Sequence, residues 1–157
     1  MRRPRPQLIF IFIIILLALF FGIRYQTSPS EFTCIANYIQ HNRAAQSRLL
    51  ISYIFGKKEG YLDLDGVIKM DNHGPQILSR RVVFTYHHDG SNYYLRSVKN
   101  TRFPADEADD KILNRLFAPF YLQPDKELFM RIHFQRSGLH LFSVEPVTTF
   151  ACKQMRE

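Results

Sequence analysis

The chain has 157 residues, among them 14 phenylalanines and 8 tyrosines, and a formal net charge of +7. This length allows one small hydrophobic core and excludes two. Residues 1–24 hold four of the 21 basic residues and no acidic residue, so the remaining chain carries only a small positive excess and we expect no direct contact with nucleic acid.

The most distinctive segment is a run of 16 uninterrupted apolar residues, 8–23, directly behind three arginines. A helix needs roughly 20 apolar residues to span a membrane, with about 17 as the lower limit, and Arg24 extends the segment by snorkelling. We therefore predict a cytoplasmic tail at 1–7, a transmembrane anchor at 8–24 in contact with membrane lipid, and a polar linker at 25–31. A cleaved secretory signal and a buried helix of a soluble protein are the alternatives.

Period-two alternation of apolar and polar residues, typical of β-strands, dominates the predicted exported domain at 32–157. Residues 32–40 fit a strand, although a helix is also possible, and residues 47–55 form a clear strand. Residues 61–70 follow as a third strand after a turn, and Gly66 within this strand indicates a bulge or a sharp bend.

Two further strands are expected around a hairpin. After a predicted turn at 71–75, residues 80–88 form a strand, and residues 93–98 return from the strong hairpin signal Asp89-Gly90. One face of the first of these strands carries Val82, Phe84, Tyr86 and His88.

Residues 106–117 break the alternation and predict a short amphipathic helix. Acidic residues crowd its first turn and basic residues follow, which complements the helix dipole, and Pro119 comes after its end. A calcium loop is the alternative for the acidic residues, but the glycine and distal glutamate of an EF-hand are missing.

Three more strands are predicted at 128–135, 139–144 and 148–153. The total is seven or eight antiparallel strands and one short helix. Strands of this number curl into a small barrel or form a half-barrel wrapped on the helix. The expected fold is thus a single N-terminal transmembrane helix followed by a mainly β domain.

The two cysteines, Cys34 and Cys152, lie near the two ends of the exported domain. In an oxidising compartment two such cysteines most often form a disulfide, and two unrelated buried thiols are the alternative. Redox catalysis is a poor explanation, because redox motifs place their cysteines close together in sequence.

No nucleophile, zinc, phosphate-binding or dinucleotide motif occurs in the sequence, so we expect a protein that is not an enzyme and holds no cofactor or metal. Histidines flank two predicted hairpins, and histidine changes its charge near neutral to mildly acidic pH. The candidate pH-sensing residues are His87, His88, His133 and His140, with scattered surface histidines of no role as the alternative.

Several weak motifs occur in a recognisable order: the basic head and anchor, the cysteine after it, Gly60 to Gly66, Ser79-Arg80-Arg81, Pro104 to Asp109, Leu116 to Leu122, and Pro146 to Cys152. Together they make the chain resemble the FidL-like family of small bacterial inner-membrane proteins. It looks most like the second regulatory component of the Myf and Psa fimbrial systems, which is analogous to ToxS-type proteins.

The resemblance implies a lipocalin-like barrel in the periplasm, with Cys34 and Cys152 as its disulfide. It also implies a function, namely that the periplasmic domain binds and stabilises a membrane-anchored ToxR-like transcription activator and permits expression of a fimbrial or adhesin operon. The alternatives are a periplasmic sensory module that binds a small apolar ligand or responds to acidic pH, and a fimbrial assembly chaperone.

Overall fold

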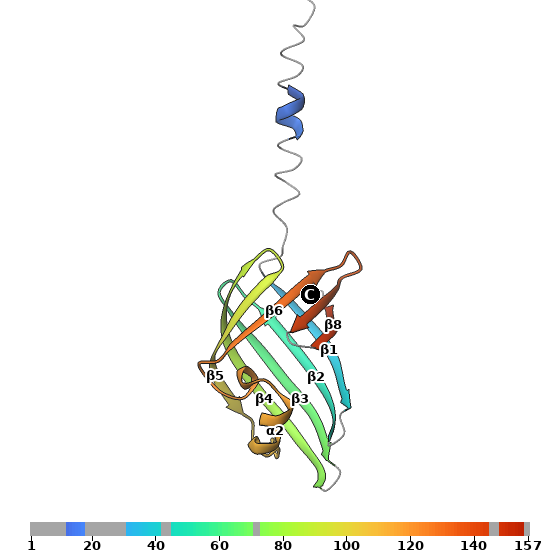
Figure 1. The fold of residues 1–157 in the computed structure, drawn as a ribbon, viewed down its shortest axis with the longest axis vertical. Coiled ribbons are helices and arrows are strands. Elements are labelled where there is room, and N and C mark those ends of the chain that lie inside the picture. The colour runs from blue at the N-terminus through green and yellow to red at the C-terminus, as the bar shows by residue number, and fades with distance from the viewer. Residues whose placement is uncertain (1–11, 18–30, 42–44, 71–72, 145–147, 156–157) are drawn as a thin grey trace, which may run out of the picture.

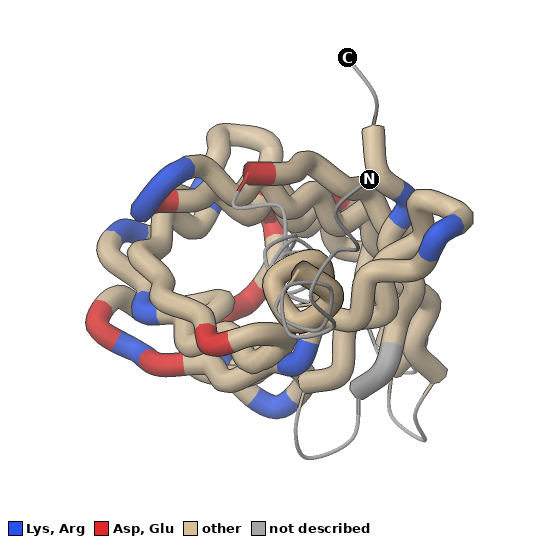
Figure 2. Tube along the Cα trace, turned by 90° about the horizontal axis from the view of Figure 1, so that it is seen from above, with Lys and Arg blue, Asp and Glu red and all other residues tan. Residues whose placement is uncertain are grey.

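The computed structural model describes residues 12–17, 31–41, 45–70, 73–144 and 148–155. Eight antiparallel strands form a closed barrel in which each strand pairs with its neighbours in sequence and β1 pairs with β8. The ribbon in Figure 1 shows their order, and the barrel viewed from above is a ring (Figure 2). The strands are β1 (Phe32–His41), β2 (Ala45–Phe55), β3 (Glu59–Met70), β4 (His73–Asp89), β5 (Asn92–Arg102), β6 (Glu127–Phe134), β7 (Leu139–Val144) and β8 (Thr148–Gln154).

Strict alternation of side chains explains why these sequences form barrel walls, because every second residue points into the core. The strand prediction is confirmed for 47–55, where the apolar face is buried, and 32–40 is a strand rather than a helix. The largest fully buried side chains are Tyr53, Tyr93, Phe55, Phe84, Phe120, Phe142, Leu62, Leu64, Ile68, Leu78, Leu95 and Leu113.

The two ends of the barrel are built differently. We define the upper end as the end where β1 begins, as drawn in Figure 1, and the opposite end as the lower end. The β4–β5 and β6–β7 hairpins both lie at the upper end, and the helix α2 (Asp110–Leu116) lies toward the lower end. The strands β1 to β5 are longer than β6 to β8, so they extend furthest toward the lower end.

The connection between β5 and β6 covers the part of β5 that β6 does not reach. The β5–β6 ladder ends at the pair Arg96 and Glu127, and below it the hydroxyl of Ser97 donates to the Gln123 carbonyl at 2.7 Å. This connection contains α2 and the 3-10 helix η1 (Pro119–Tyr121), which buries Phe120 against Phe84 at a ring separation of 6.0 Å. The lower half of the wall is thus completed by an insert rather than by a strand.

The beginning of β4 differs from the prediction. The strand begins at His73, whereas residues 71–75 were predicted to form a turn and the strand was expected only from residue 80. The sequence Gly74-Pro75 reads as a turn, but here it coincides with a register shift in the β3–β4 ladder between Ile68 and Met70. A proline that cannot donate to the ladder is accommodated at such an irregularity.

The prediction at Gly66 was a bulge or a sharp bend, and the bulge is wrong because the registers of β3 with β2 and with β4 run through this residue without a shift. A Cβ atom at Gly66 would collide with the backbone of Arg48 and Leu49 in β2. Glycine therefore permits a close approach of two strands at this position.

The predicted helix at 106–117 is confirmed in part, because α2 begins only at Asp110. Asp109 is the N-cap residue, and its carboxylate accepts a hydrogen bond from the Lys111 amide at 2.8 Å. Asp106 precedes the helix and is buried, so its charge does not serve the helix dipole as predicted. Its partner is an arginine on β4.

A disulfide joins Cys34 and Cys152, as predicted, across 118 residues of chain. The two cysteines lie on β1 and β8, where the ladder consists of only two register pairs, Cys34 with Gln154 and Ile35 with Lys153. Both sulfur-bearing residues are fully buried. The closure of the barrel therefore depends on a covalent bond in addition to a short ladder.

Most residues of the predicted tail (1–7), anchor (8–24) and linker (25–31) lie outside the described residues. Residues 12–17 are helical and their side chains are exposed. Among the residues that the structure describes, no helix is long and apolar enough to cross a membrane.

Candidate functional site

The structure brings the four candidate histidines to the upper end of the barrel, because the two hairpins that carry them both lie there. They do not form one cluster. His87 is exposed and stacks on Tyr94 with ring centroids 4.8 Å apart, and His88 stacks on Tyr93 at 4.9 Å. His133 is exposed, whereas His140 is buried.

His140 is the one member of this set inside the barrel. Its ring packs edge-on against Phe134 at 4.6 Å and against Phe32 at 5.3 Å. Burial lowers the pKa of His140, and contacts with the Leu139 backbone and the Gln154 side chain offset part of this effect. Neither ring nitrogen has a hydrogen-bond partner of good geometry among the described residues. The neutral form of His140 is therefore favoured in the folded protein.

Aromatic rings fill the upper part of the barrel interior. Phe55 stacks on Phe32 at 4.6 Å and meets the edge of Tyr93 at 5.5 Å, and Tyr53 contacts Phe142 at 5.1 Å. The pKa of Tyr93 is raised to about 12, mainly by burial, and its hydroxyl has no hydrogen-bond partner among the described residues. This part of the interior is occupied by the protein's own side chains.

A second tyrosine contact lies deeper in the barrel and links the wall to the insert. The hydroxyls of Tyr53 on β2 and Tyr121 on η1 are 3.3 Å apart. Burial raises the pKa of both tyrosines, that of Tyr121 to about 12. Both hydroxyls therefore stay protonated at neutral pH, and the contact is a neutral hydrogen bond that positions η1.

A concave opening of about 670 Å³ lies beside the point where β1 begins. Its lining includes the rings of Phe32 and Phe55 together with Ile54, Gln154 and Met155. Two of these residues belong to the aromatic filling of the interior, so the opening borders the core.

A groove of about 420 Å³ on β4, β5 and β6 was not predicted from the sequence. His87, Tyr94 and Phe129 line it side by side, with Tyr94 and Phe129 ring centroids 5.1 Å apart. The guanidinium of Arg131 lies 5.9 Å from the Phe129 ring. The sequence signal for this groove was a set of aromatic residues at strand positions where the alternation places polar residues. The strand registers bring these residues next to one another only in the folded sheet.

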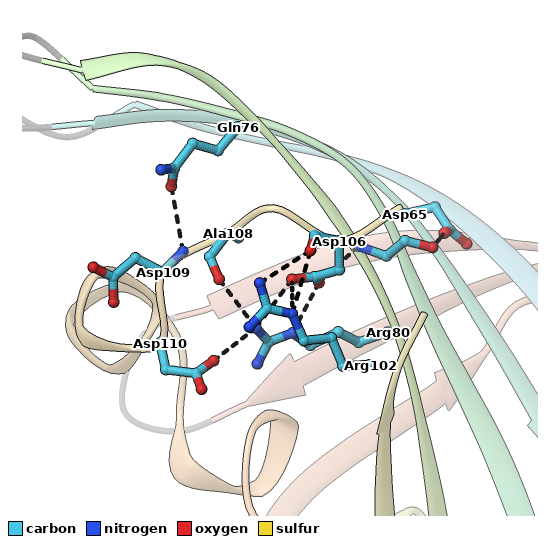
Figure 3. Close-up of polar contacts among 9 residues, drawn as sticks. Asp65, Gln76, Arg80, Arg102, Asp106, Ala108, Asp109 and Asp110 are labelled. Atoms are coloured by element: carbon cyan, nitrogen blue, oxygen red, sulfur yellow. Dashed lines mark hydrogen bonds and ion pairs between the residues drawn. The ribbon is translucent and has the colours of Figure 1, made fainter. Parts of the chain in front are cut away.

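Arg80 points from β4 into the lower half of the barrel, where its guanidinium has several polar partners. Its Nε atom lies 2.9 Å from the Asp106 carboxylate, and its guanidinium also reaches Asp110 at 2.6 Å and the Ala108 carbonyl at 3.3 Å. Figure 3 shows these groups converging from β4 and from the segment that leads into α2. Arg102 on β5 adds a second cation at 2.9 Å from Asp106.

Asp106 is held ionised by these partners. Burial alone would raise its pKa, but hydrogen bonds from Arg80 and from the Ser79 amide outweigh burial and lower the pKa below 3.8. The pKa of Arg80 is correspondingly raised: burial lowers it, and its hydrogen bonds to Asp106 and Asp110 outweigh that effect. We call Arg80, Arg102, Asp106 and Asp110 the ionic clamp, because they fasten the β5–β6 insert to the wall.

The ionic clamp joins two of the sequence motifs that suggested a family. Arg80 belongs to the motif at 79–81, and Asp106 belongs to the motif at 104–109. These motifs therefore have a structural explanation in this chain. Among the described residues, no group of three or more histidines, cysteines or carboxylates is placed to hold a metal ion.

Comparisons with known proteins give one family and one relative. A family model described as the YqeJ C-terminal domain matches residues 31–152, which run from the start of the barrel to the second cysteine of the disulfide. The uncharacterized protein YqeJ of Escherichia coli (strain K12) is 28% identical over 113 residues, covering 70% of this chain and 69% of that protein. No solved structure matches the chain.

Proposed function

The chain belongs to the YqeJ C-terminal domain family, and we propose that it is an accessory protein that acts by contact with another protein. The proposed partner is a membrane-anchored ToxR-like transcription activator, which the barrel binds and stabilises in the periplasm. This contact would permit expression of a fimbrial or adhesin operon. The choice of partner derives from the sequence resemblance to FidL-like and ToxS-type proteins.

The observation that carries the proposal is the aromatic filling of the upper barrel. Tyr53, Phe55, Tyr93 and Phe142 are fully buried in mutual ring contacts. A barrel filled by its own side chains offers other molecules its outer surface and the stretch of β1 that does not pair with β8. Those are the parts from which protein contacts are made.

The disulfide supports the proposed location. Cys34 and Cys152 are paired and buried, and structural disulfides persist in oxidising compartments such as the bacterial periplasm. The apolar run at 8–23 is the proposed anchor, with the N-terminus in the cytoplasm and the barrel on the other side of the inner membrane. Two proteins anchored in one membrane meet at a raised effective concentration.

The test is deletion of the gene followed by measurement of activator abundance and target transcription. We expect the amount of one membrane-anchored activator to fall, together with the transcripts of its operon. Complementation with the wild-type gene restores both, and complementation with Cys34→Ala/Cys152→Ala restores less. Unchanged activator and transcript levels in the deletion strain would reject the proposal.

A second candidate function is sensing of a small apolar molecule, which the opening beside Phe32 and Phe55 favours. The buried hydroxyl of Tyr93 and ring nitrogens of His140 belong to the same upper part of the barrel and lack partners among the described residues. A fluorescent apolar probe such as anilinonaphthalene sulfonate tests this candidate with the full-length protein. Saturable binding that Phe55→Ala abolishes supports it, and no binding by the folded wild-type protein contradicts it.

A further inference from the structure

The strand β1 has a free edge below the disulfide. All ten residues of β1 pair with β2, but only Cys34 and Ile35 pair with β8. Figure 1 shows β1 running on toward the lower end of the barrel past β8. Among the residues that the structure describes, Asn37 to His41 have no ladder partner on the side away from β2.

The direction of the backbone groups along this edge follows from one hydrogen bond. The Met155 amide donates to the Thr33 carbonyl at 2.9 Å, so the backbone groups of Thr33 face β8. In an antiparallel strand these groups alternate between the two neighbours. Asn37, Ile39 and His41 therefore direct their N–H and C=O groups to the free edge.

The side chains at the free edge are exposed. Asn37 and His41 are exposed, and Ile39 is 58% exposed, the highest value for a large apolar side chain in the barrel wall. On the interior side, the Tyr38 ring lies 6.2 Å from the ring of Phe150, which β8 contributes from across the edge. An added strand would thus find apolar surface on both of its faces.

The three described strands at the edge carry a small positive charge. The sequences of β1, β2 and β8 contain no acidic residue, and their only charged side chains apart from histidine are Arg48 and Lys153. Arg48 lies directly opposite Ile39 in the β1–β2 register. Native proteins protect an exposed edge with charges, bulges or a covering element, whereas this stretch of β1 carries an exposed isoleucine.

We infer that the lower edge of β1, from Asn37 to His41, is the docking site for an extended acidic segment of a partner protein, which adds to the barrel as a further strand. Acidic residues on the outer face of the segment would pair with Arg48, which lies opposite Ile39, and its apolar residues would meet Ile39 and the Tyr38 ring. A second copy of this chain is a poorer occupant, because its β1 edge carries the same positive charge. The inference rests on the proposed function for the identity of the partner.

The first test measures peptide binding to the full-length protein in detergent micelles. The probes are synthetic peptides of about ten residues, alternating valine with glutamate or valine with lysine, which matches the length of an ordinary strand. We expect the glutamate peptide alone to bind and to protect the Ile39 amide from hydrogen exchange. Equal binding of the lysine peptide, or no protection at Ile39, would overturn the inference.

A matched pair of variants separates the backbone from the side chain. Ile39→Pro removes the outward N–H without removing a bond to β2, and Ile39→Ala keeps the N–H. The proline variant should weaken binding of the glutamate peptide by about tenfold through the lost hydrogen bond, and the alanine variant by only about twofold. Equal weakening in both folded variants, or self-association of the wild type through this edge, would contradict an acidic partner strand.

Complementation of the deletion strain distinguishes this inference from the proposed function. We expect Ile39→Pro to leave the activator as scarce as the deletion does, and Ile39→Ala to restore it. If deletion lowers the activator but the proline variant restores it fully, the docking edge is wrong and the proposed function stands. If deletion changes nothing, the proposed function is wrong, and the peptide measurements alone decide on the edge.

Discussion

The upper and lower ends of the barrel are closed by different chemistry. At the upper end, β6 to β8 complete the ring, and the disulfide between Cys34 and Cys152 joins the last strand to the first. At the lower end, β6 to β8 do not reach, and an insert is fastened by the ionic clamp around Arg80. One closure therefore depends on redox state, and the other depends on paired charges in a buried setting.

Because the two closures differ in chemistry, the barrel is held together unequally around its circumference. The covalent bond fixes β8 to β1 beside their two ladder pairs, and among the described residues the two strands share no pair further down. The ionic clamp holds the opposite wall, where β4 and β5 meet the insert. The variants below act on one closure at a time.

The largest effect is expected from Cys34→Ala/Cys152→Ala, which removes the upper closure. The disulfide closes a loop with a sequence separation of 118, for which the chain-entropy model gives a loss of about 5 kcal/mol in the free energy of unfolding. Denaturant unfolding of the full-length protein measures this loss. A change below about 1 kcal/mol would show that the short β1–β8 ladder suffices without the bond.

The next effect in size is expected from Arg80→Met at the lower closure. This change leaves the buried Asp106 carboxylate with Arg102 and the Ser79 amide as its remaining partners, and breaking a buried pair costs about 3 kcal/mol or more. Denaturant unfolding measures the change. Arg80→Met combined with Asp106→Leu should recover part of the loss, and a double variant less stable than Arg80→Met alone would contradict the ionic clamp.

A smaller effect concerns pH and separates the two ends. Because burial lowers the pKa of His140 below its usual 6.5, the unfolded chain binds more protons than the folded protein just below that pH. Stability should therefore fall as the pH drops from 7 through this window. His140→Phe is expected to reduce this slope, and His133→Phe on the same hairpin is expected to leave it unchanged.

The lower end should respond only at stronger acidity. The pKa of Asp106 lies below 3.8 in the folded protein, so its stabilising effect is complete above that pH and is lost as the pH falls through the lowered value. Denaturant unfolding at a series of pH values from about 7 to about 3 checks the pH range of His140 and that of Asp106. This series spans the usual pKa values of histidine and aspartate. If the free energy of unfolding depends on pH equally in wild type and in His140→Phe, His140 is not the cause of the stability loss just below pH 6.5.

The smallest effect is expected from Arg81→Met, the neighbour of Arg80 on the outer face. Arg81 pairs with Asp63 at 2.6 Å, but its side chain is 44% exposed, and exposed pairs contribute about 0.5 kcal/mol. Unfolding by denaturant should barely distinguish this variant from wild type. A loss as large as that of Arg80→Met would show that the interior position of Arg80 is not what makes the ionic clamp strong.

Much of the wall could be predicted from alternation, because a half-buried strand repeats every two residues. The strands β6, β7 and β8 were placed within about a residue, which is within the usual uncertainty of strand ends. Alternation failed at the start of β4, where Gly74-Pro75 resembles a turn and the register irregularity that accommodates it depends on β3. It also could not show that β1 and β8 share so short a ladder.

Contacts between residues far apart in the sequence limited how much of the candidate sites could be predicted. Asp106 looked like a helix-start residue because its neighbours are acidic, and its true partner, Arg80, lies 26 residues away. The histidines were assigned to hairpins correctly, but the face of each depends on its position in the alternation. His140 shares the interior face with Phe142, whereas His133 lies between the inward Ile132 and the half-buried Phe134.

Amide hydrogen exchange along β1 of the full-length protein decides whether the edge of β1 beneath the disulfide is open. Ile35 faces β8 within the ladder and Tyr38 faces β2, so both amides should exchange slowly. The amides of Asn37 and Ile39 should exchange much faster, because they face solvent at the edge. Exchange at Ile39 as slow as at Ile35 and Tyr38 would contradict the open edge and the docking site inferred from it.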